Sequence, residues 1–293
     1  MCCPLEHYRD KAVRKVLKNK PLVEAIFELR WDLYEQLPTG EKVDPYYKVL
    51  SGGIYNKLRE DYPLIESLPA ADVPERFSGH IVQSRFRSES KWPLIQIGPG
   101  VITLNDTEGY IWEDFRKRAL DLTDVLFNMH PEPERLKLNK AMLRYIDGIE
   151  FDYEQVDIFT FLKEQMKTEL SLYHKLFEDT GVGKTPEGFG MNFSFPSTSP
   201  AGIVVLRIAK RTQAKEDTKI KLIKWTHQAD PDKTWTKDDG KINALIWETI
   251  VDSSGEHSPR NREAIPEWID QAHKLTDDWF FKTIEGELER RFE

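Results

Sequence analysis

Hydrophobic and polar residues alternate strictly over residues 21–33, close to the start of the chain. A period of two residues is typical of a β-strand with one buried and one exposed face. The pattern therefore predicts a strand that packs one face against a core and turns charged side chains outward. The apolar face would hold Val23, Ala25, Phe27, Leu29 and Trp31.

The following hundred or so residues predict a helix, a set of strands and a second helix. Asp44-Pro45 supplies a helix N-cap and a favourable first-turn proline, and apolar residues then recur at helical spacing to about Tyr62. Gly52 and Gly53 inside this helix predict a kink or a close crossing of another backbone. An apolar stripe over residues 110–129 predicts the second helix, which would lie on the sheet. Strands are expected over residues 77–88, 92–98 and 101–105.

The same order of elements begins again after residues 131–134, whose sequence Pro-Glu-Pro-Glu ends the preceding helix. A strand, a helix, four strand-like runs and a long amphipathic helix follow. A meander is the simplest antiparallel arrangement of the four runs. The predicted elements are a strand at 136–151, a helix at 156–177, strands at 190–195, 203–211, 219–228 and 242–251, and a helix at 262–292.

The repeated order predicts an α+β fold of two related units, each with a strand, a helix, an antiparallel sheet and a closing helix. In topology such a unit resembles a helix-grip or TATA-binding-protein-like unit, in which a curved sheet wraps one long helix. The duplication rests on element order, because the two halves do not repeat residue by residue. The predicted organisation is a basic helical segment at 1–20, a first unit at 21–130 and a second unit at 135–293.

Composition and charge narrow the classes of function. With 39% hydrophobic and 31% charged residues, the chain has the composition of a soluble globular protein. Its formal net charge of −8 disfavours nucleic-acid binding, which needs a basic face, although basic residues gathered on one side of a sheet would reopen that possibility. No apolar run approaches the roughly 18–20 residues of a membrane span, and no apolar signal region is present, so a cytoplasmic protein is expected.

Familiar catalytic and metal-binding patterns are missing from the sequence. Residues 181–185 read Gly-Val-Gly-Lys-Thr, but Glu178 stands where the first glycine of a phosphate-binding loop belongs, and Pro186 prevents the helix that must follow. The seven histidines are scattered singly, and Cys2 and Cys3 have no partner cysteines elsewhere. Neither a metal nor another cofactor is therefore expected.

The unusual polar positions lie around a glycine turn and in the centre of a strand. Gly98-Pro99-Gly100 permits backbone geometry that other residues resist, and Asn105-Asp106 can cap the next helix or place its N-terminus beside an anionic group. Arg144 and Tyr145 are neighbours in a predicted strand, so one of them must point inward, and a buried arginine needs a partner or a ligand. The candidate ligand-binding residues are Gly98, Gly100, Asn105, Glu108, Arg144 and Tyr145.

The segments Pro21–Leu29, Gln96–Asn105 and Leu143–Ile146, together with Tyr110 and Trp112, resemble a sporadically distributed bacterial family of about this length that is functionally uncharacterised. The resemblance spans the chain and carries no catalytic roles with it. The patchy distribution of such a family implies an accessory gene passed between genomes, as in anti-phage defence or toxin and antitoxin systems.

The leading hypothesis is a cytoplasmic, non-enzymatic binding or adaptor protein that recognises a protein partner or a small ligand at the sheet or between units. The alternative is an enzyme with an unfamiliar site near Asn105, Glu108 and Arg144, acting on a phosphorylated or nucleotide substrate. Nucleic-acid binding by the sheet is a third, less favoured hypothesis. Apolar edges on the second sheet would favour a homodimer.

Overall fold

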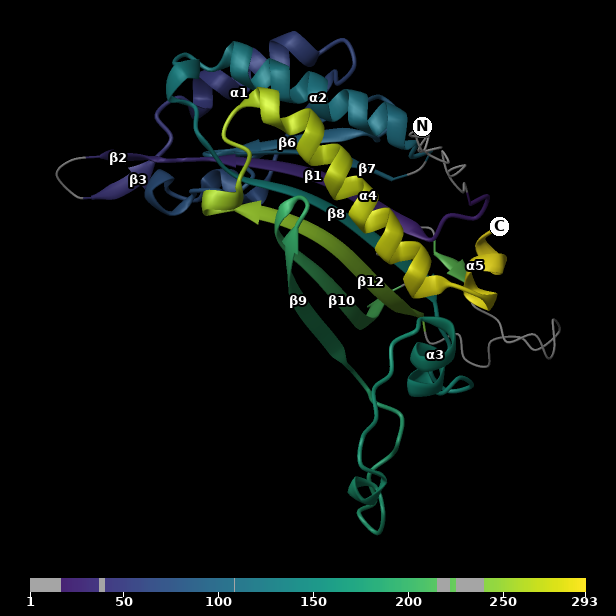
Figure 1. The fold of residues 1–293 in the computed structure, drawn as a ribbon. Coiled ribbons are helices and arrows are strands. Elements are labelled where there is room, and N and C mark those ends of the chain that lie inside the picture. The colour runs from purple at the N-terminus through teal and green to yellow at the C-terminus, as the bar shows by residue number, and fades with distance from the viewer. Residues whose placement is uncertain (1–16, 37–39, 108, 215–221, 225–239) are drawn as a thin grey trace, which may run out of the picture.

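The computed structural model describes residues 17–36, 40–107, 109–214, 222–224 and 240–293 of the chain. One large, mostly antiparallel sheet forms its centre, with helices packed on one face (Figure 1), so the predicted α+β class is confirmed. A short two-residue strand, β11 (Ile223–Lys224), pairs in parallel with β8. Along the sheet the order is β4 (Leu64–Ser67), β5 (Ser84–Arg87), β6 (Leu94–Gly98), β7 (Val101–Asp106), β1 (Leu22–Trp31), β8 (Leu138–Glu150), β12 (Lys241–Ser254), β10 (Ala201–Ala214) and β9 (Gly190–Thr198).

Three helices cover the same face of this sheet: α1 (Tyr47–Leu58), α2 (Trp112–Met129) and α4 (Ile265–Ile284) (Figure 1). Their apolar stripes and the inward face of the central strands form one continuous core. Two shorter helices, α3 (Ile158–Gln165) and α5 (Glu287–Phe292), pack in a second cluster with the ends of β8 and β12. A small hairpin of β2 (Tyr34–Gln36) and β3 (Glu41–Val43) is separate from the main sheet.

The sheet joins strands from both halves of the chain. β1 pairs with β7 on one side and with β8 on the other, so that Phe27 lies between Leu104 and Leu143. The large core contains Leu122 from the first half and Val251 from the second. Strands on either side of residues 131–134 therefore share one sheet and one core.

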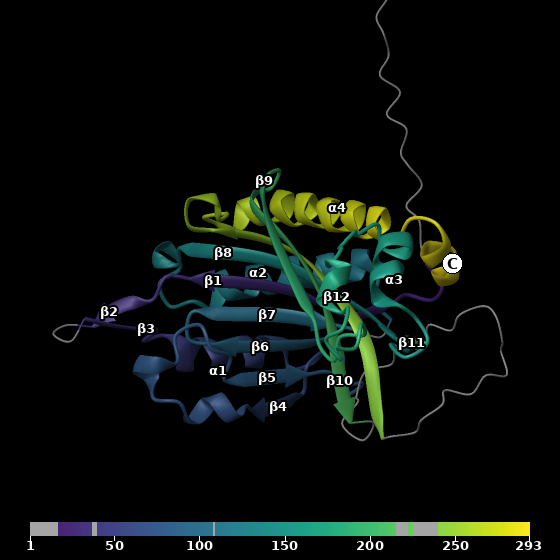
Figure 2. The ribbon, with the colours of Figure 1, turned by 90° about the horizontal axis from the view of Figure 1, so that it is seen from below.

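The alternation of residues 21–33 is confirmed by β1, and it separates two unlike sheet faces. Phe27, Leu29 and Trp31 are fully buried on the helix side. Figure 2 views the sheet from the opposite side, and on this open face charged side chains form ion pairs. Lys140 pairs with Asp252 at 2.7 Å and Arg144 with Glu248 at 2.8 Å across β8 and β12, and Arg30 pairs with Glu28 at 2.7 Å within β1.

Several predicted elements are shorter than the sequence pattern indicates. The helix expected over residues 156–177 ends at Gln165, because the backbone turns at Lys167, where φ is +50°, and the amides of Met166 and Thr168 both donate to the carbonyl of Leu162. The chain then extends away from the sheet before β9 begins (Figure 1). The expected final helix over residues 262–292 is divided at Gly286, where φ is +113°.

The strand predictions also need correction. Only residues 84–87 of the run at 77–88 form a strand. Of the four-stranded meander, β9, β10 and β12 pair in sequence, whereas β11 leaves it to pair with β8. The remainder of the expected run at 219–228 lies outside the described residues.

Candidate functional site

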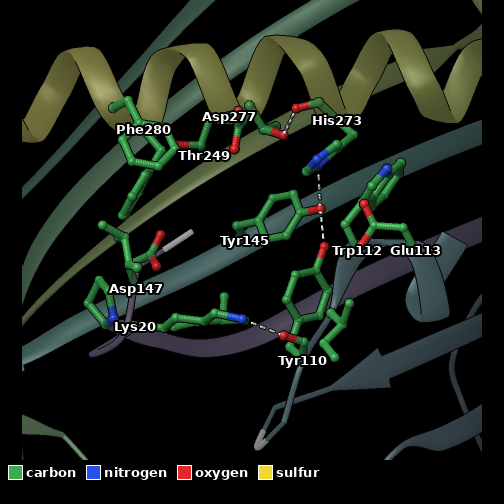
Figure 3. Close-up of a pocket in the computed structure, with 16 residues that line it drawn as sticks. Lys20, Tyr110, Trp112, Glu113, Tyr145, Asp147, Thr249, His273, Asp277 and Phe280 are labelled. Atoms are coloured by element: carbon green, nitrogen blue, oxygen red, sulfur yellow. Dashed lines mark hydrogen bonds between the residues drawn. The ribbon is translucent and has the colours of Figure 1, made fainter. Parts of the chain in front are cut away.

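A cavity of about 310 Å³ lies on the helix side of the sheet, beneath α4. Its walls come from α4, the start of α2, the middle of β8 and the segment that leads into β1 (Figure 3). Most of its lining is apolar, and a few polar groups converge on it, which is typical of a site for a small molecule.

Asp147 is the most unusual residue of this cavity. It is 3% exposed, and its carboxyl group faces the space bounded by Tyr145, Lys20 and Phe280 (Figure 3). No hydrogen bond or ion pair joins this carboxyl group to another residue of the described ranges, and burial raises its pKa to about 8. At neutral pH the side chain therefore carries a proton for most of the time.

The strand register explains why an acid lies here. Asp147 follows Tyr145 at the spacing of two that keeps both side chains on the helix side of β8. Its backbone neighbours are Leu22 on β1 and Trp247 on β12, so the residue sits in the centre of the sheet. At 3% exposure the carboxyl group has little contact with bulk water, so its charged form is costly.

A hydrogen-bonded chain of three side chains forms one wall. The hydroxyl groups of Tyr110 and Tyr145 are 2.7 Å apart, and the Tyr145 hydroxyl is 2.9 Å from Nδ1 of His273. Trp112 stacks on the His273 ring, with 3.6 Å between ring centroids and 14° between ring planes. These contacts join the segment before α2 and its first residue to β8 and α4 (Figure 3).

Three carboxyl groups and one ammonium group lie among the described lining residues. Glu113 from the first turn of α2 and Asp277 from α4 line it together with Asp147. The one ammonium group among the described lining residues belongs to Lys20, and it donates to the carbonyl oxygen of Tyr110 at 2.7 Å. Aromatic walls beside the buried carboxyl group of Asp147 are complementary to a ligand that combines an apolar body with a positive charge.

The structure places the predicted candidates Tyr145 and Arg144 on opposite faces of β8. Tyr145 points into the cavity, whereas Arg144 lies on the open face and pairs with Glu248. Asn105 is on that open face too, because Asn105 and Arg144 both lie opposite Ile26 in the strand register. Asn105 donates to Glu24 at 2.7 Å and accepts from Thr103 at 2.6 Å, so the sheet itself satisfies its amide.

The glycine turn serves packing. A Cβ on Gly98 would lie 1.9 Å from the carbonyl oxygen of Ile81, and Gly100 has φ of +74°. The amide of Gly100 donates to the buried carboxylate of Asp44, which also accepts from the indole of Trp31. Gly98 and Gly100 thus belong to a tight connection between β6 and β7.

The predicted cap of the second helix by Asn105-Asp106 is wrong. These residues end β7, and the Asp106 carboxylate accepts from the amide of Thr107. α2 begins only at Trp112, without a side-chain cap. Glu108, the remaining candidate, lies outside the described residues.

Sequence reasoning missed Asp147 and His273. Asp147 falls on the buried phase of the predicted strand 136–151, and an acid at a buried position is a usable signal. His273 falls on the apolar stripe of the last helix, where it looks like a core residue.

In the described part of the chain, no group of three or more His, Cys, Asp or Glu side chains is placed to hold a metal ion. None of the described helices is long and apolar enough to cross a membrane. No protein-family model matches the sequence, and no curated protein matches it significantly.

Proposed function

We propose that this protein binds a small organic ligand in the cavity beneath α4. The observation that carries the proposal is Asp147, whose buried carboxyl group faces the cavity and has no partner among the described residues. A buried carboxyl group without a hydrogen bond costs several kcal/mol, so such groups usually have a functional reason or a partner supplied from outside. A bound ligand would supply that partner.

The surrounding framework supports a binding role. The linked side chains of Tyr110, Tyr145 and His273 come from different elements, and this arrangement fixes the wall before any ligand arrives. A ligand held between a long helix and a curved sheet is also the arrangement expected of a helix-grip unit, which we propose for the part of the sheet under α4.

Other functions have less support from the contacts. The enzyme hypothesis placed its phosphate-binding cation at Arg144, but Arg144 is paired with Glu248 on the face of the sheet opposite the cavity. Lys140 and Arg207 on that face also contact carboxylates, which lowers its attraction for nucleic acid.

Native mass spectrometry of the protein purified gently from cells tests the proposal, with chemical analysis of any molecule released on denaturation. We expect a stoichiometric small molecule on the wild-type protein. Thr249→Phe should abolish it by filling the cavity, since Thr249 lines the cavity from β12. Thr212→Phe on the exposed part of β10 is the control and should retain the molecule.

Circular dichroism should show that both variants fold. Equal ligand loading of Thr249→Phe and wild type would place the ligand elsewhere. A wild-type protein that carries no small molecule and is stabilised by no member of a metabolite library contradicts the proposed function.

A further inference from the structure

We infer that the ligand of this cavity carries a protonated nitrogen, such as a primary amine, on a flat apolar body, and that Asp147 forms the ion pair with that nitrogen. This inference rests on the proposed function and specifies the chemical class of its ligand. It is based on the position of Asp147, the balance of charge around it and the rings that line the cavity.

The charge of Asp147 favours a cation. Its carboxyl group has no counter-charge among the described residues, and the nearby ammonium group of Lys20 donates to the carbonyl oxygen of Tyr110 instead. The other titratable groups that line the cavity are the side chains of Tyr110, Glu113, Tyr145, His273 and Asp277. An anionic ligand gains no counter-charge from Asp147, whereas a cationic ligand does.

The carboxyl group is buried, which makes an ion pair there selective. Asp147 is 3% exposed, so water competes poorly for its oxygens once a ligand is bound. An uncharged ligand can only exchange hydrogen bonds with the protonated carboxyl group, whereas an ammonium group stabilises the carboxylate form and donates charge-assisted hydrogen bonds to its oxygens.

The ring walls suit the rest of such a molecule. Phe280 lies on the same side of Tyr145 as Asp147, and Trp112 lies on the other side (Figure 3). Aromatic faces attract cations and also pack against flat apolar groups. A ligand with its amine at Asp147 and its flat body against the aromatic lining would satisfy both features.

Binding involves a defined proton balance. The free protein holds the carboxyl group protonated at neutral pH, because burial raises the pKa of Asp147 to about 8. When an alkylammonium ligand binds, the Asp147 proton leaves to solvent, and the carboxylate accepts hydrogen bonds from the ammonium group. One proton is released for each ligand bound, so affinity rises up to about tenfold per pH unit below the pKa of Asp147.

Three probes with the same indole body test this assignment: tryptamine, which is cationic, tryptophol, which is neutral, and indole-3-acetate, which is anionic. Titration calorimetry at pH 6, 7 and 8 measures their affinities. We expect tryptamine to bind at least tenfold more tightly than either other probe, and to gain several-fold in affinity between pH 6 and 7. In buffers of different ionisation enthalpy, the heats should show release of a proton.

Two matched variants complete the test. Asp147→Asn keeps the shape of the side chain but cannot become an anion, so it should lose at least tenfold in tryptamine affinity and most of its pH dependence. The control Asp278→Asn removes a carboxylate from α4 that pairs with Lys282 and does not line the cavity. This variant should bind tryptamine as tightly as wild type.

The outcomes separate this inference from the proposed function. If tryptophol or indole-3-acetate binds as well as tryptamine, or if Asp147→Asn binds tryptamine like wild type, the cationic class is wrong and a small-molecule site remains. A host-derived ligand that is neutral or anionic overturns the inference in the same way. If no probe binds and the purified protein carries no molecule, both proposals fail.

Discussion

The indole ring of Trp112 lies flat on the imidazole ring of His273, with 3.6 Å between the ring centroids. This contact joins the first turn of α2 to the middle of α4, and both residues line the cavity. The cavity wall therefore depends on a packing contact between two helices that lie far apart in the sequence.

Replacing Trp112 with alanine should weaken this contact and the fold. The loss of a large, partly buried ring that stacks on a neighbour should lower the free energy of unfolding by about 2–3 kcal/mol. Trp112→Phe keeps an aromatic face over His273 and should recover most of that loss. Urea unfolding of the two variants beside wild type measures the difference, and identical midpoints for alanine and phenylalanine would show that the stacking contributes nothing.

Asp147→Asn should change how stability depends on pH. The folded protein keeps the Asp147 proton up to about pH 8, whereas the unfolded chain loses it near the ordinary value of 3.8. Between these pH values the folded state binds more protons, so the Asp147 contribution lowers the stability of the wild type as pH rises, by about 1.4 kcal/mol per pH unit. Asparagine does not titrate, and the variant should lack this part of the slope.

Urea unfolding at pH 5, 7 and 8.5 measures the effect as the difference between variant and wild type. We expect the variant to gain stability relative to wild type as pH rises to about 8, and the difference to stay constant above that value. Asp278→Asn, which removes a half-exposed carboxylate paired with Lys282, should track wild type. A pH-independent difference for Asp147→Asn would mean that the carboxyl group ionises normally in the fold.

The buried carboxylate of Asp44 links the end of β1, the start of α1 and the turn between β6 and β7 through hydrogen bonds. Its carboxylate accepts from the indole of Trp31 at 3.0 Å, from the amide of Gly100 at 3.0 Å and from the amide of Tyr46 at 3.1 Å. Asp44→Ala leaves these donors without their acceptor, and we expect a loss of about 3 kcal/mol in the free energy of unfolding. Thermal unfolding measures it, and a melting temperature equal to that of Asp44→Asn would contradict the assigned role.

Two glycines should respond in opposite ways to alanine. Gly98→Ala brings a Cβ to 1.9 Å from the carbonyl oxygen of Ile81, so the backbone must move, and we expect severe destabilisation or no folded protein. Gly52→Ala in α1 meets no atom within 4 Å, and it should stabilise the helix by up to about 1 kcal/mol. Chemical unfolding of both variants measures the difference in stability. A folded Gly98→Ala protein with wild-type stability would rule out the close approach of the Ile81 backbone to Gly98.

Local patterns predicted the elements whose faces are strongly amphipathic. The alternation around Phe27 predicts β1, and the stripe containing Phe115 and Leu122 predicts α2. In both elements the residues of the buried face recur at the period of the secondary structure, so the sequence pattern reveals it. The helix after Asp157 was predicted too long because the turn at Lys167 uses neither glycine nor proline, so no breaker marks it.

The cavity could be predicted only in part. The strand pattern requires one of Arg144 and Tyr145 to point inward without deciding which, and the prediction favoured Arg144, whereas the structure directs Tyr145 into the cavity. The meeting of Tyr145 with His273 and Trp112 depends on how α2 and α4 lie across the sheet, and no local spacing encodes that arrangement. The pairing of β1 with β8 is a similar long-range property, since apolar strands of either half could have been neighbours.

Arg144 provides a test of which sheet face carries the function. Its guanidinium lies 2.8 Å from Glu248, whose side chain is largely buried, and Arg207 contacts the same carboxylate at 3.5 Å. Arg144→Ala leaves Glu248 with the weaker partner, so we expect a loss of about 2 kcal/mol in the free energy of unfolding. Arg207 is more exposed, so Arg207→Ala should lower the free energy of unfolding by less than about 1 kcal/mol.

Because both arginines lie on the face opposite the cavity, neither change should alter ligand loading measured by native mass spectrometry. If Arg144→Ala removes the ligand while the protein keeps its stability, the open face of the sheet binds it, and the assignment of the site to Asp147 is wrong.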